Sequence, residues 1–323
     1  MNSTKTALVT GATSGLGFEA AIHLANAGYG RVIISGRSSD RAHAAAKAMK
    51  ERTGKDVFEP LTLDLNSSEN VRAAAEDLSV RGHALSALIL NAGLVGGAKL
   101  AKTQEDVEVT FSASLIGHHQ LTMALLDAEL VAPNARIVIA GSEAARGDVP
   151  TFTPVDLPSY AAKHFDGDRE AAATSLIRHD GPQKYKPAAV YATAKLFVAW
   201  WASSLAEILP SGTTVNAVSP GSAPGTDAGR NANFFMRTIM MPVMKRAPKR
   251  LGMAATVPVA AQRYIDAVGF DSNINGQFFA SAPKKMTGPL HKVDLAHVND
   301  RVSRDAAWKA TVKVAASETS TAV

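Results

Sequence analysis

Hydrophobic and polar positions along residues 5–93 alternate between short runs of aliphatic residues and longer Ala-rich stretches with a helical period. The short runs predict strands at residues 7–10, 31–35, 57–63 and 87–90. The stretches between them predict helices at residues 15–27, 39–52 and 67–80. Strands that alternate with helices form βαβ units, so this half of the chain predicts a parallel sheet.

The same alternation continues through the second half of the chain. It predicts helices at residues 105–130, 188–209 and 254–268, and strands at residues 136–140, 213–218 and 277–280. The pattern therefore predicts one α/β domain over residues 1–290, a doubly wound parallel sheet of about seven strands with a Rossmann fold. A C-terminal tail with one amphipathic helix follows at residues 291–323.

Two segments interrupt this rhythm. Residues 145–187 contain five prolines and scattered polar residues, so we expect an irregular insertion rather than a second folded domain. Residues 222–252 follow turn residues and become apolar and basic, which suggests a substrate lid. Both segments leave the sheet at its C-terminal edge, where ligands of such folds bind.

Composition narrows the class of protein. The 46% hydrophobic content supports a large core and excludes disorder. The net charge of +5 is spread along the chain, so nucleic acid is not implied as a partner. Because the chain has no cysteine, disulfides, thiolate catalysis and Cys-ligated metals are excluded. Redox chemistry would therefore need a cofactor.

The termini and apolar runs bear on localisation. A strand pattern begins at residue 6, which leaves no room for the layout of a signal peptide. The most apolar later stretch, residues 196–209, is shorter than the ~20 residues of a membrane-spanning helix. We expect a cytoplasmic protein without a transmembrane segment.

A glycine-rich loop provides the first chemical signal. Residues 10–17 read Thr-Gly-Ala-Thr-Ser-Gly-Leu-Gly, directly after the first strand and at the start of the first helix. Glycines let the backbone approach a pyrophosphate, and a helix N-terminus offers free N–H groups to it. The alternative is a glycine-rich turn without a ligand, which the strand-loop-helix context disfavours.

The end of the second strand indicates which cofactor is bound. A site for NAD usually has an acid here that binds both ribose hydroxyls, whereas a cation suits a 2′-phosphate. Arg37, flanked by Ser35 and Ser38, favours NADP(H). The alternative is a solvated arginine at a turn, with Asp40 close by.

A third signal is Tyr191 followed four residues later by Lys195 on a predicted helix. This spacing places the phenol and the ammonium on one face. A fixed cation is a plausible way to bring a tyrosine into a useful working range. On its own such a pair is usually structural, and its meaning depends on the other motifs.

Together these motifs resemble the short-chain dehydrogenase/reductase family. The matching motifs are the loop at residues 10–17, Leu63-Asp64-Leu65, Asn91-Ala92-Gly93, Ser142, Tyr191 with Lys195, and Ser219-Pro220-Gly221. They follow the predicted strands in order over residues 5–280. The resemblance implies that Tyr191 donates or accepts the proton and that Ser142 orients the carbonyl. It further implies that Lys195 binds the nicotinamide ribose and lowers the pKa of Tyr191.

The resemblance also implies a set of cofactor-binding residues. Asp64 would lie by the adenine, Asn91 and Gly93 on the adenosine ribose side, and Pro220 and Gly221 by the nicotinamide. The full set is Gly11, Thr13, Ser14, Gly15, Leu16, Gly17, Arg37, Asp64, Leu65, Asn91, Ala92, Gly93, Tyr191, Lys195, Pro220 and Gly221.

Three departures from the family pattern matter. The helical asparagine that often completes a proton relay is matched here by Ser114. The usual Ser-Ser pair is Gly141-Ser142. Ser142 and Tyr191 lie several times farther apart in sequence than is usual, because the proline-rich insertion lies between them. This layout resembles the branch of retinol dehydrogenase and protochlorophyllide reductase.

Other conspicuous residues have mainly structural interpretations. His118 and His119 are adjacent on a helix, point to different sides and are expected to pack rather than bind a metal. Residues 234–244 are either a helix against the core or an adaptable, Met-rich apolar lid. Residues 245–250 are expected to be a solvated basic face, with an anionic-substrate or membrane-surface contact as the alternative.

These observations predict an NADP(H)-dependent oxidoreductase that transfers hydride between the nicotinamide and a carbonyl or secondary alcohol. The two covering segments favour a bulky hydrophobic substrate. A non-catalytic NADP(H)-binding sensor or scaffold is the alternative, and an epimerase or dehydratase of the extended relatives fits the glycine spacing less well. The resemblance implies a homodimer or homotetramer. No metal is expected.

Overall fold

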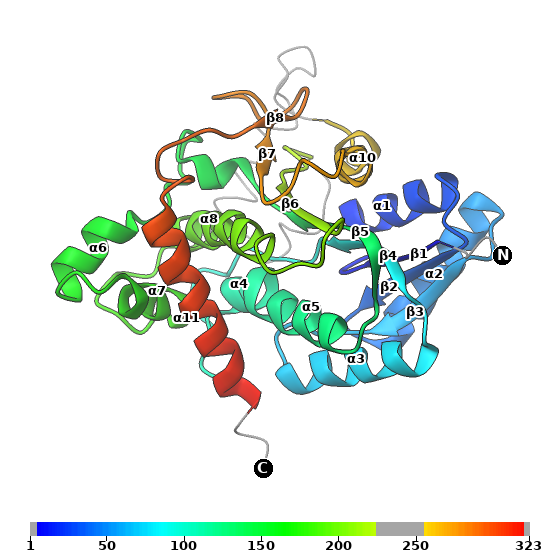
Figure 1. Cartoon of the computed structure of the whole chain (residues 1–323), viewed down its shortest axis with the longest axis horizontal. Coiled ribbons are helices and arrows are strands. Elements are labelled where there is room, and N and C mark those ends of the chain that lie inside the picture. Colours follow the sequence, from blue (N-terminus) through cyan, green and yellow to red (C-terminus); the bar gives the residue numbers. More distant parts are fainter. Residues whose placement is uncertain (1–4, 224–254, 320–323) are drawn as a thin grey trace.

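The computed structural model describes residues 5–223 and 255–319, and these residues contain one eight-stranded sheet (Figure 1). Its order is β3-β2-β1-β4-β5-β6-β7-β8. The strands are β1 (Thr6–Val9), β2 (Arg31–Gly36), β3 (Phe58–Thr62), β4 (Leu85–Leu90), β5 (Val131–Ala140), β6 (Thr214–Val218), β7 (Phe278–Ala280) and β8 (His291–Lys292). All neighbouring pairs are parallel except β7 with β8. The chain is thus a doubly wound α/β domain.

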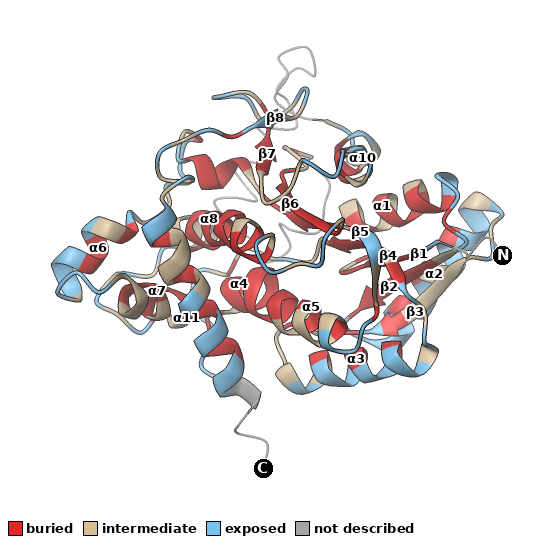
Figure 2. Cartoon of the chain, in the orientation of Figure 1, coloured by how far each residue is buried: buried red, intermediate tan, exposed pale blue. Residues whose placement is uncertain are grey.

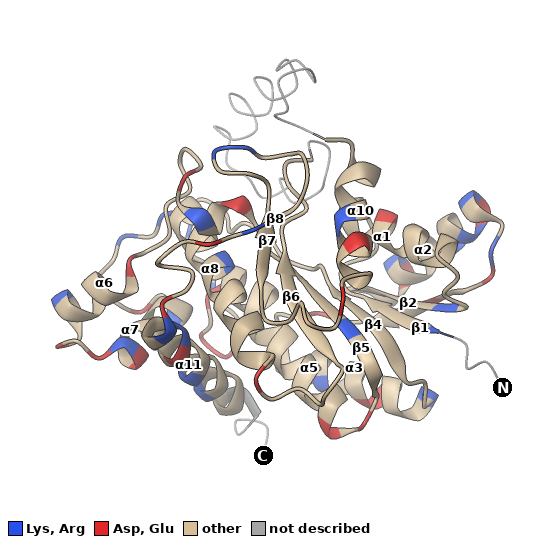
Figure 3. Ribbon diagram, turned by 45° about the horizontal axis from the view of Figure 1, so that its top comes forward, with Lys and Arg blue, Asp and Glu red and all other residues tan. Residues whose placement is uncertain are grey.

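Helices cover both faces of the sheet. One face carries α1 (Gly15–Asn26), α2 (Ser39–Thr53) and α10 (Val257–Val268). The other carries α3 (Ser68–Arg81), α4 (Val109–Phe111), α5 (Gly117–Asp127), α8 (Pro187–Leu205) and, outside these, α6 (Leu157–His164), α7 (Arg169–Arg178) and α11 (Arg301–Thr319). Figure 2 shows that the central strands and α8 are mostly buried, whereas the outer helices present an exposed face. Acidic and basic residues are interspersed along α7 and α11 (Figure 3).

Alternate residues of each central strand enter two separate cores. In β1, Leu8 packs into the core beneath α3, α5 and α8, whereas Ala7 and Val9 pack beneath α1 and α10. Such strands are buried on both faces and read as continuous apolar runs. The chain returns from the β3 edge to β4, beside β1, so the strand order reverses between β1 and β4. Ligands of doubly wound folds bind at this reversal.

The seven predicted strands are confirmed, with ends that differ by a few residues. β8 has only two residues, too few for a period-two pattern, and the sequence analysis missed it. The predicted helix over residues 105–130 begins only at Val109, and a π-helical segment, Ser112–Ile116, separates α4 from α5. Hydrophobic periodicity over one turn cannot distinguish a π-helical segment from an α-helix.

The expectation of an irregular insertion is wrong for residues 157–178, which form α6 and α7. Asp156 caps α6 by accepting from the Ser159 N–H at 3.2 Å, and Asp168 caps α7 by accepting from the Glu170 N–H at 2.9 Å. Apolar side chains of both helices join the core on the α8 side. The two aspartates are the N-cap signal that could have predicted both helices.

The amphipathic helix expected in the tail is present as α11, and it does not lie apart from the domain. Its Ala307, Ala310 and Val314 are buried in the same core as α8. The indole N–H of Trp200 donates to the carbonyl oxygen of His297 at 3.1 Å, just before α11. The described part of the tail is therefore packed against the Rossmann domain rather than being a surface extension.

His118 and His119 point to different sides, as the sequence predicts. His118 Nε2 lies 2.9 Å from the Thr10 hydroxyl, and its Nδ1 lies 3.3 Å from the carbonyl oxygen of Ser114. His119 Nδ1 accepts from the indole N–H of Trp201 at 3.1 Å. Burial lowers the pKa of His118 to about 3 and that of His119 to about 4. Both imidazoles therefore stay neutral at pH 7.

These two histidines predict acid sensitivity. Between pH ~6.5 and the pKa in the folded protein, the unfolded chain binds a proton that the folded chain does not, so stability falls as the pH falls. We expect the free energy of unfolding to drop by about 2 kcal/mol per imidazole between pH ~7.5 and pH ~5. Urea denaturation at both pH values measures the drop. His119→Gln should reduce this drop in the free energy of unfolding, whereas replacement of the exposed His43 should not. An equal drop in all variants would contradict the assignment.

Candidate functional site

The turn between β1 and α1 approaches its neighbours too closely for side chains. Gly11 has φ +63°, and a Cβ on Gly17 would lie 2.6 Å from both Asn91 Nδ2 and the Gly11 carbonyl oxygen. Asn91 Nδ2 donates to the Thr10 carbonyl oxygen at 2.9 Å, and the Gly11 N–H donates to Ser35 Oγ at 3.2 Å. The ends of β2 and β4 thus fix the glycine loop at the point where the strand order reverses.

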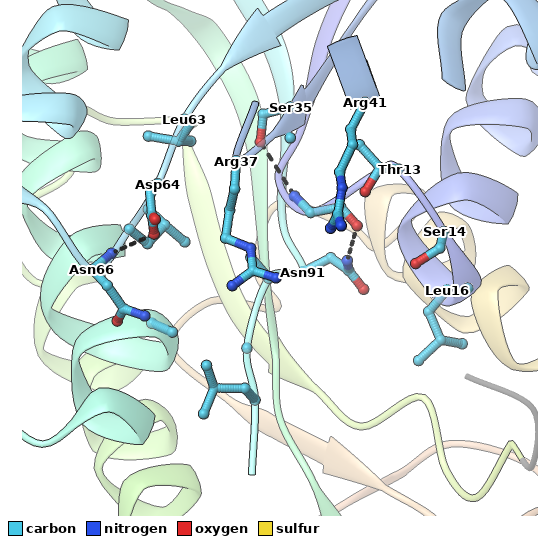
Figure 4. A pocket seen from close by; sticks show the side chains of 18 residues that line it. Thr13, Ser14, Leu16, Ser35, Arg37, Arg41, Leu63, Asp64, Asn66 and Asn91 are labelled. Carbon is cyan, nitrogen blue, oxygen red and sulfur yellow. Dashed lines mark hydrogen bonds between the residues drawn. The ribbon is translucent and has the colours of Figure 1, made fainter. Parts of the chain in front are cut away.

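A cleft of about 290 Å³ opens beside this loop (Figure 4). It is lined by Gly11, Thr13, Ser14, Gly15, Leu16, Ser35, Gly36, Arg37, Arg41, Leu63, Asp64, Leu65, Asn66, Asn91, Ala92, Gly93, Leu94 and Ala113. Eleven of the sixteen residues predicted to bind the cofactor are in this set. Of the other five, Gly17 is packed behind the loop, and Tyr191, Lys195, Pro220 and Gly221 lie outside this cleft.

Two arginines line one side of the cleft. Arg37 follows β2, Arg41 comes from the first turn of α2, and both side chains are exposed (Figure 4). Ser38 is the N-cap residue of α2, yet its hydroxyl makes no capping hydrogen bond. Arg41 is not among the residues predicted to bind the cofactor, although its position four residues after Arg37, at the start of a predicted helix, indicates the same cleft. The donor set fits a phosphorylated ribose better than a ribose diol.

Ser142, Tyr191 and Lys195 come together from β5 and α8. Ser142 lies two residues after the end of β5 and caps the 3₁₀ turn Glu143–Arg146, where its hydroxyl oxygen accepts from the Ala144 N–H at 3.2 Å. Lys195 Nζ lies 5.7 Å from the ring centroid of Tyr191 and donates to the Ala140 carbonyl oxygen at 2.7 Å. Gly141 suits its position, since a Cβ there would lie 2.8 Å from the Phe278 ring.

Burial dominates the electrostatics of these groups. It raises the pKa of Tyr191, a hydrogen bond with Ser142 opposes the rise, and the charge of Glu143 adds to it. Burial lowers the pKa of Lys195 to about 8. The pKa of Tyr191 is raised, not lowered as the family resemblance implies, because burial of the phenol outweighs the hydrogen bond with Ser142. Lys195 donates its hydrogen bond to a backbone carbonyl rather than to the phenol.

Ser114 lies in the π-helical segment close to Lys195. A Cβ at Gly93 would lie 3.1 Å from Ser114 Oγ and 3.5 Å from Lys195 Nζ, so both groups flank the same backbone position. Ser114 is 1% exposed, and its hydroxyl oxygen has no hydrogen-bond partner among the described residues. A buried hydroxyl without a partner costs free energy unless water or a ligand satisfies it.

The structure describes the insertion but almost none of the predicted lid, the two segments expected to cover the site. Of the insertion, Phe152 lies beside the site, with its ring centroid 5.8 Å from that of Tyr191, whereas α7 packs against α11 and α6 packs against α7. The predicted lid, including residues 234–244 and the basic residues 245–250, lies almost wholly outside the described residues. Among the described residues, no three His, Asp or Glu side chains are arranged to hold a metal ion.

Comparisons with known proteins identify relatives of this chain. Residues 5–165 match the family model of the short chain dehydrogenases. Retinol dehydrogenase 13 of Homo sapiens is 27% identical over 292 residues, covering 88% of this chain and 78% of that protein. Polyprenol dehydrogenase of Mus musculus is 30% identical over 237 residues, covering 72% of this chain and 64% of that protein.

Solved structures share the fold. An uncharacterised protein of Mycobacterium paratuberculosis has a TM-score of 0.68 at 22% identity, with 97% of this chain and 94% of that chain covered. A short chain dehydrogenase of Burkholderia cenocepacia in complex with NADP has a TM-score of 0.60 at 23% identity, with 85% of this chain and 95% of that chain covered.

The fold and the site define a nucleotide-binding oxidoreductase of the Rossmann type. The chain belongs to the short-chain dehydrogenase/reductase family, in its retinol dehydrogenase-like branch. Among the described residues, no helix is both long and apolar enough to span a membrane.

Proposed function

We propose that this protein is an NADP(H)-dependent oxidoreductase that interconverts a carbonyl and a secondary alcohol. The observation that carries the proposal is the joint placement of Ser142, Tyr191 and Lys195 at the edge of the sheet where the glycine loop and the two-arginine cleft lie. The NADP named for the Burkholderia structure supports the choice of cofactor.

The protein's own groups would divide the work as follows. The glycine loop and the start of α1 offer N–H groups to the pyrophosphate, and Arg37 with Arg41 binds the 2′-phosphate. Ser142 and Tyr191 donate hydrogen bonds to the substrate oxygen, where negative charge grows during reduction. Tyr191 supplies the proton, for which its raised pKa keeps it protonated at pH 7. When bound, NADPH supplies the hydride.

Ser114 is proposed to connect the site to water. Its unpartnered hydroxyl can donate and accept, and it flanks Gly93 on the same side as Lys195. A serine is shorter than the asparagine common in the family, so a relay through Ser114 requires an additional water between its hydroxyl and Lys195.

NADPH oxidation tests the proposed function directly. The purified protein is mixed with NADPH or NADH and a panel of ketones, and the loss of the absorbance of the reduced nicotinamide is followed. Turnover that needs both NADPH and a carbonyl supports the proposal. Tight NADPH binding with no turnover across the panel would favour the sensor or scaffold alternative.

Substrate size gives a second test. The named substrates of the two relatives, retinol and polyprenol, are long apolar alcohols. Phe152 beside Tyr191 provides an apolar wall. We expect kcat/KM to rise along a series of ketones of increasing length, by up to about fourfold per buried methylene, which corresponds to ~0.8 kcal/mol. Phe152→Ala should flatten this rise.

A matched control comes from the same insertion. Phe165 packs beside Tyr160, at the end of α6. Phe165→Ala should leave the dependence on ketone length unchanged. A flat dependence in the unmutated protein, or equal effects of the two substitutions, would show that the insertion does not narrow the substrate site.

A further inference from the structure

Two buried side chains of opposite charge, Glu143 and Arg263, lie next to the proposed catalytic serine. Glu143 is 3% exposed and immediately follows Ser142, and Arg263 is 7% exposed on α10. Arg263 Nη1 lies 3.5 Å from Glu143 Oε1. The family resemblance assigned no role to either residue, and neither touches the cleft beside the glycine loop.

Both carboxylate oxygens of Glu143 accept hydrogen bonds from other segments. Oε2 accepts from the hydroxyl of Ser219, at the end of β6. Oε1 accepts from the hydroxyl of Ser281 at 2.8 Å and from its N–H at 3.2 Å, just after β7. Glu143 thus connects the catalytic-serine segment to the ends of two neighbouring strands, which lie side by side near α10 (Figure 1).

The contact with Ser219 passes on to the turn that follows it. Because the Ser219 hydroxyl donates its hydrogen bond to Glu143, its oxygen is free to accept another. It accepts from the Gly221 N–H at 3.1 Å. Gly221 has φ +78°, and a Cβ there would lie 2.6 Å from the Met286 carbonyl oxygen. The turn at residues 219–221 therefore has a defined backbone conformation that depends on Ser219.

Arg263 fixes the same turn from the other side. Its Nη1 donates to the Ser219 carbonyl oxygen at 3.0 Å, and its Nη2 donates to the Gly288 carbonyl oxygen at 2.6 Å. The carboxylate of Glu143 binds the Ser219 hydroxyl, and the guanidinium of Arg263 binds the Ser219 carbonyl oxygen. Together these two contacts fix the position of Ser219. A charge pair buried to this degree loses hydration, and breaking it leaves the remaining charge uncompensated.

We propose that Glu143 and Arg263 form a positioning pair that aligns the turn at residues 219–221 with Ser142, and so orients the nicotinamide end of the bound cofactor without contributing to binding of its adenosine end. The proposal rests on the proposed function, since it assumes that the turn faces the nicotinamide. It makes both residues act through Ser219 rather than through the substrate or the cofactor.

The test compares two ligands that differ in the nicotinamide half. NADPH and 2′,5′-ADP share the adenosine and the 2′-phosphate, but only NADPH carries the nicotinamide. In Glu143→Gln, we expect the Kd of NADPH to rise about tenfold or more and the Kd of 2′,5′-ADP to stay within about twofold. The rate of hydride transfer at saturating NADPH should fall as well. Isothermal titration measures the first two quantities, and single-turnover absorbance measures the third.

Ser219→Ala gives a second route to the same answer if Glu143→Gln does not fold. It removes the hydroxyl that connects Glu143 to Gly221 and keeps the buried charge pair. It should shift the ratio of the two Kd values in the same direction. Arg169→Gln is the control, because it breaks an ion pair with Asp300 that joins α7 to α11 and should leave the ratio unchanged.

The outcomes separate the two proposals. Equal weakening of NADPH and 2′,5′-ADP in Glu143→Gln and Ser219→Ala, or no change in either, would overturn the positioning role while leaving the proposed function intact. An unmutated protein that binds neither NADPH nor 2′,5′-ADP would overturn the proposed function and the inference with it.

Discussion

Replacing Tyr191 by phenylalanine is expected to lower the single-turnover rate of carbonyl reduction by about 10²- to 10⁴-fold, the usual contribution of a positioned proton donor. The substitution removes only the hydroxyl, so the ring contact with Phe152 and the packing of α8 should persist. The Kd of NADPH should therefore change by less than about threefold. Stopped-flow absorbance gives the rate, and titration of the nicotinamide fluorescence gives the Kd.

Two further variants calibrate this result. Lys195→Ala should impair both the rate and NADPH binding, because the ammonium lies beside Tyr191 and the family resemblance implies that it contacts the ribose. Ser114→Ala should reduce the rate by less than about tenfold, because water can replace a single hydroxyl. A Tyr191→Phe variant that keeps most of its single-turnover rate would show that another group donates the proton. A loss in Ser114→Ala as large as that in Tyr191→Phe would make Ser114 a primary catalytic residue.

The parts of the fold that could be predicted are those with long, regular patterns. Strands such as β2 and β4 are apolar on both faces, and helices such as α3 end at a glycine in the left-handed region, Gly82. The helices of the insertion could not be predicted from its prolines, which are typical of irregular structure, and only the N-caps Asp156 and Asp168 indicate them. Yet Pro158 lies in the first turn of α6, where a proline is tolerated.

Only part of the candidate site could be predicted from the sequence. Residues in contiguous motifs, such as the glycine loop and Tyr191 with Lys195, could be located from the sequence because their spacing is local. Glu143 and Arg263 could not be paired, because they are far apart in the chain and meet only when β6, β7 and α10 pack together. An acid placed directly after the proposed catalytic serine was the one local signal, and by itself it does not identify its partner.

Cofactor preference is the second large effect. We expect Arg37→Ala to weaken NADPH binding by about 10- to 150-fold, since a charge-assisted hydrogen bond contributes about 1.5–3 kcal/mol. NADH lacks the 2′-phosphate, so its Kd should change little. Arg41 lines the same cleft, and the double variant Arg37→Ala/Arg41→Ala should remove most of the preference for NADPH. Titrations of each variant with both cofactors at one salt concentration measure the preference.

Arg52→Ala provides the matched control for charge. Arg52 lies on the same helix as Arg41 but pairs with Glu19 on α1 and does not line the cleft. Arg52 carries the same charge as Arg37 and Arg41. If the preference for NADPH over NADH arose from the net positive charge of the protein, it would fall in Arg52→Ala too, whereas direct contact with the 2′-phosphate predicts no change. Equal affinity of the unmutated protein for NADPH and NADH would contradict the role of both arginines. Since Arg37 rather than an acid directly follows β2, NADH should remain a weak ligand even of the double variant, and the loss of preference should come from weaker binding of NADPH.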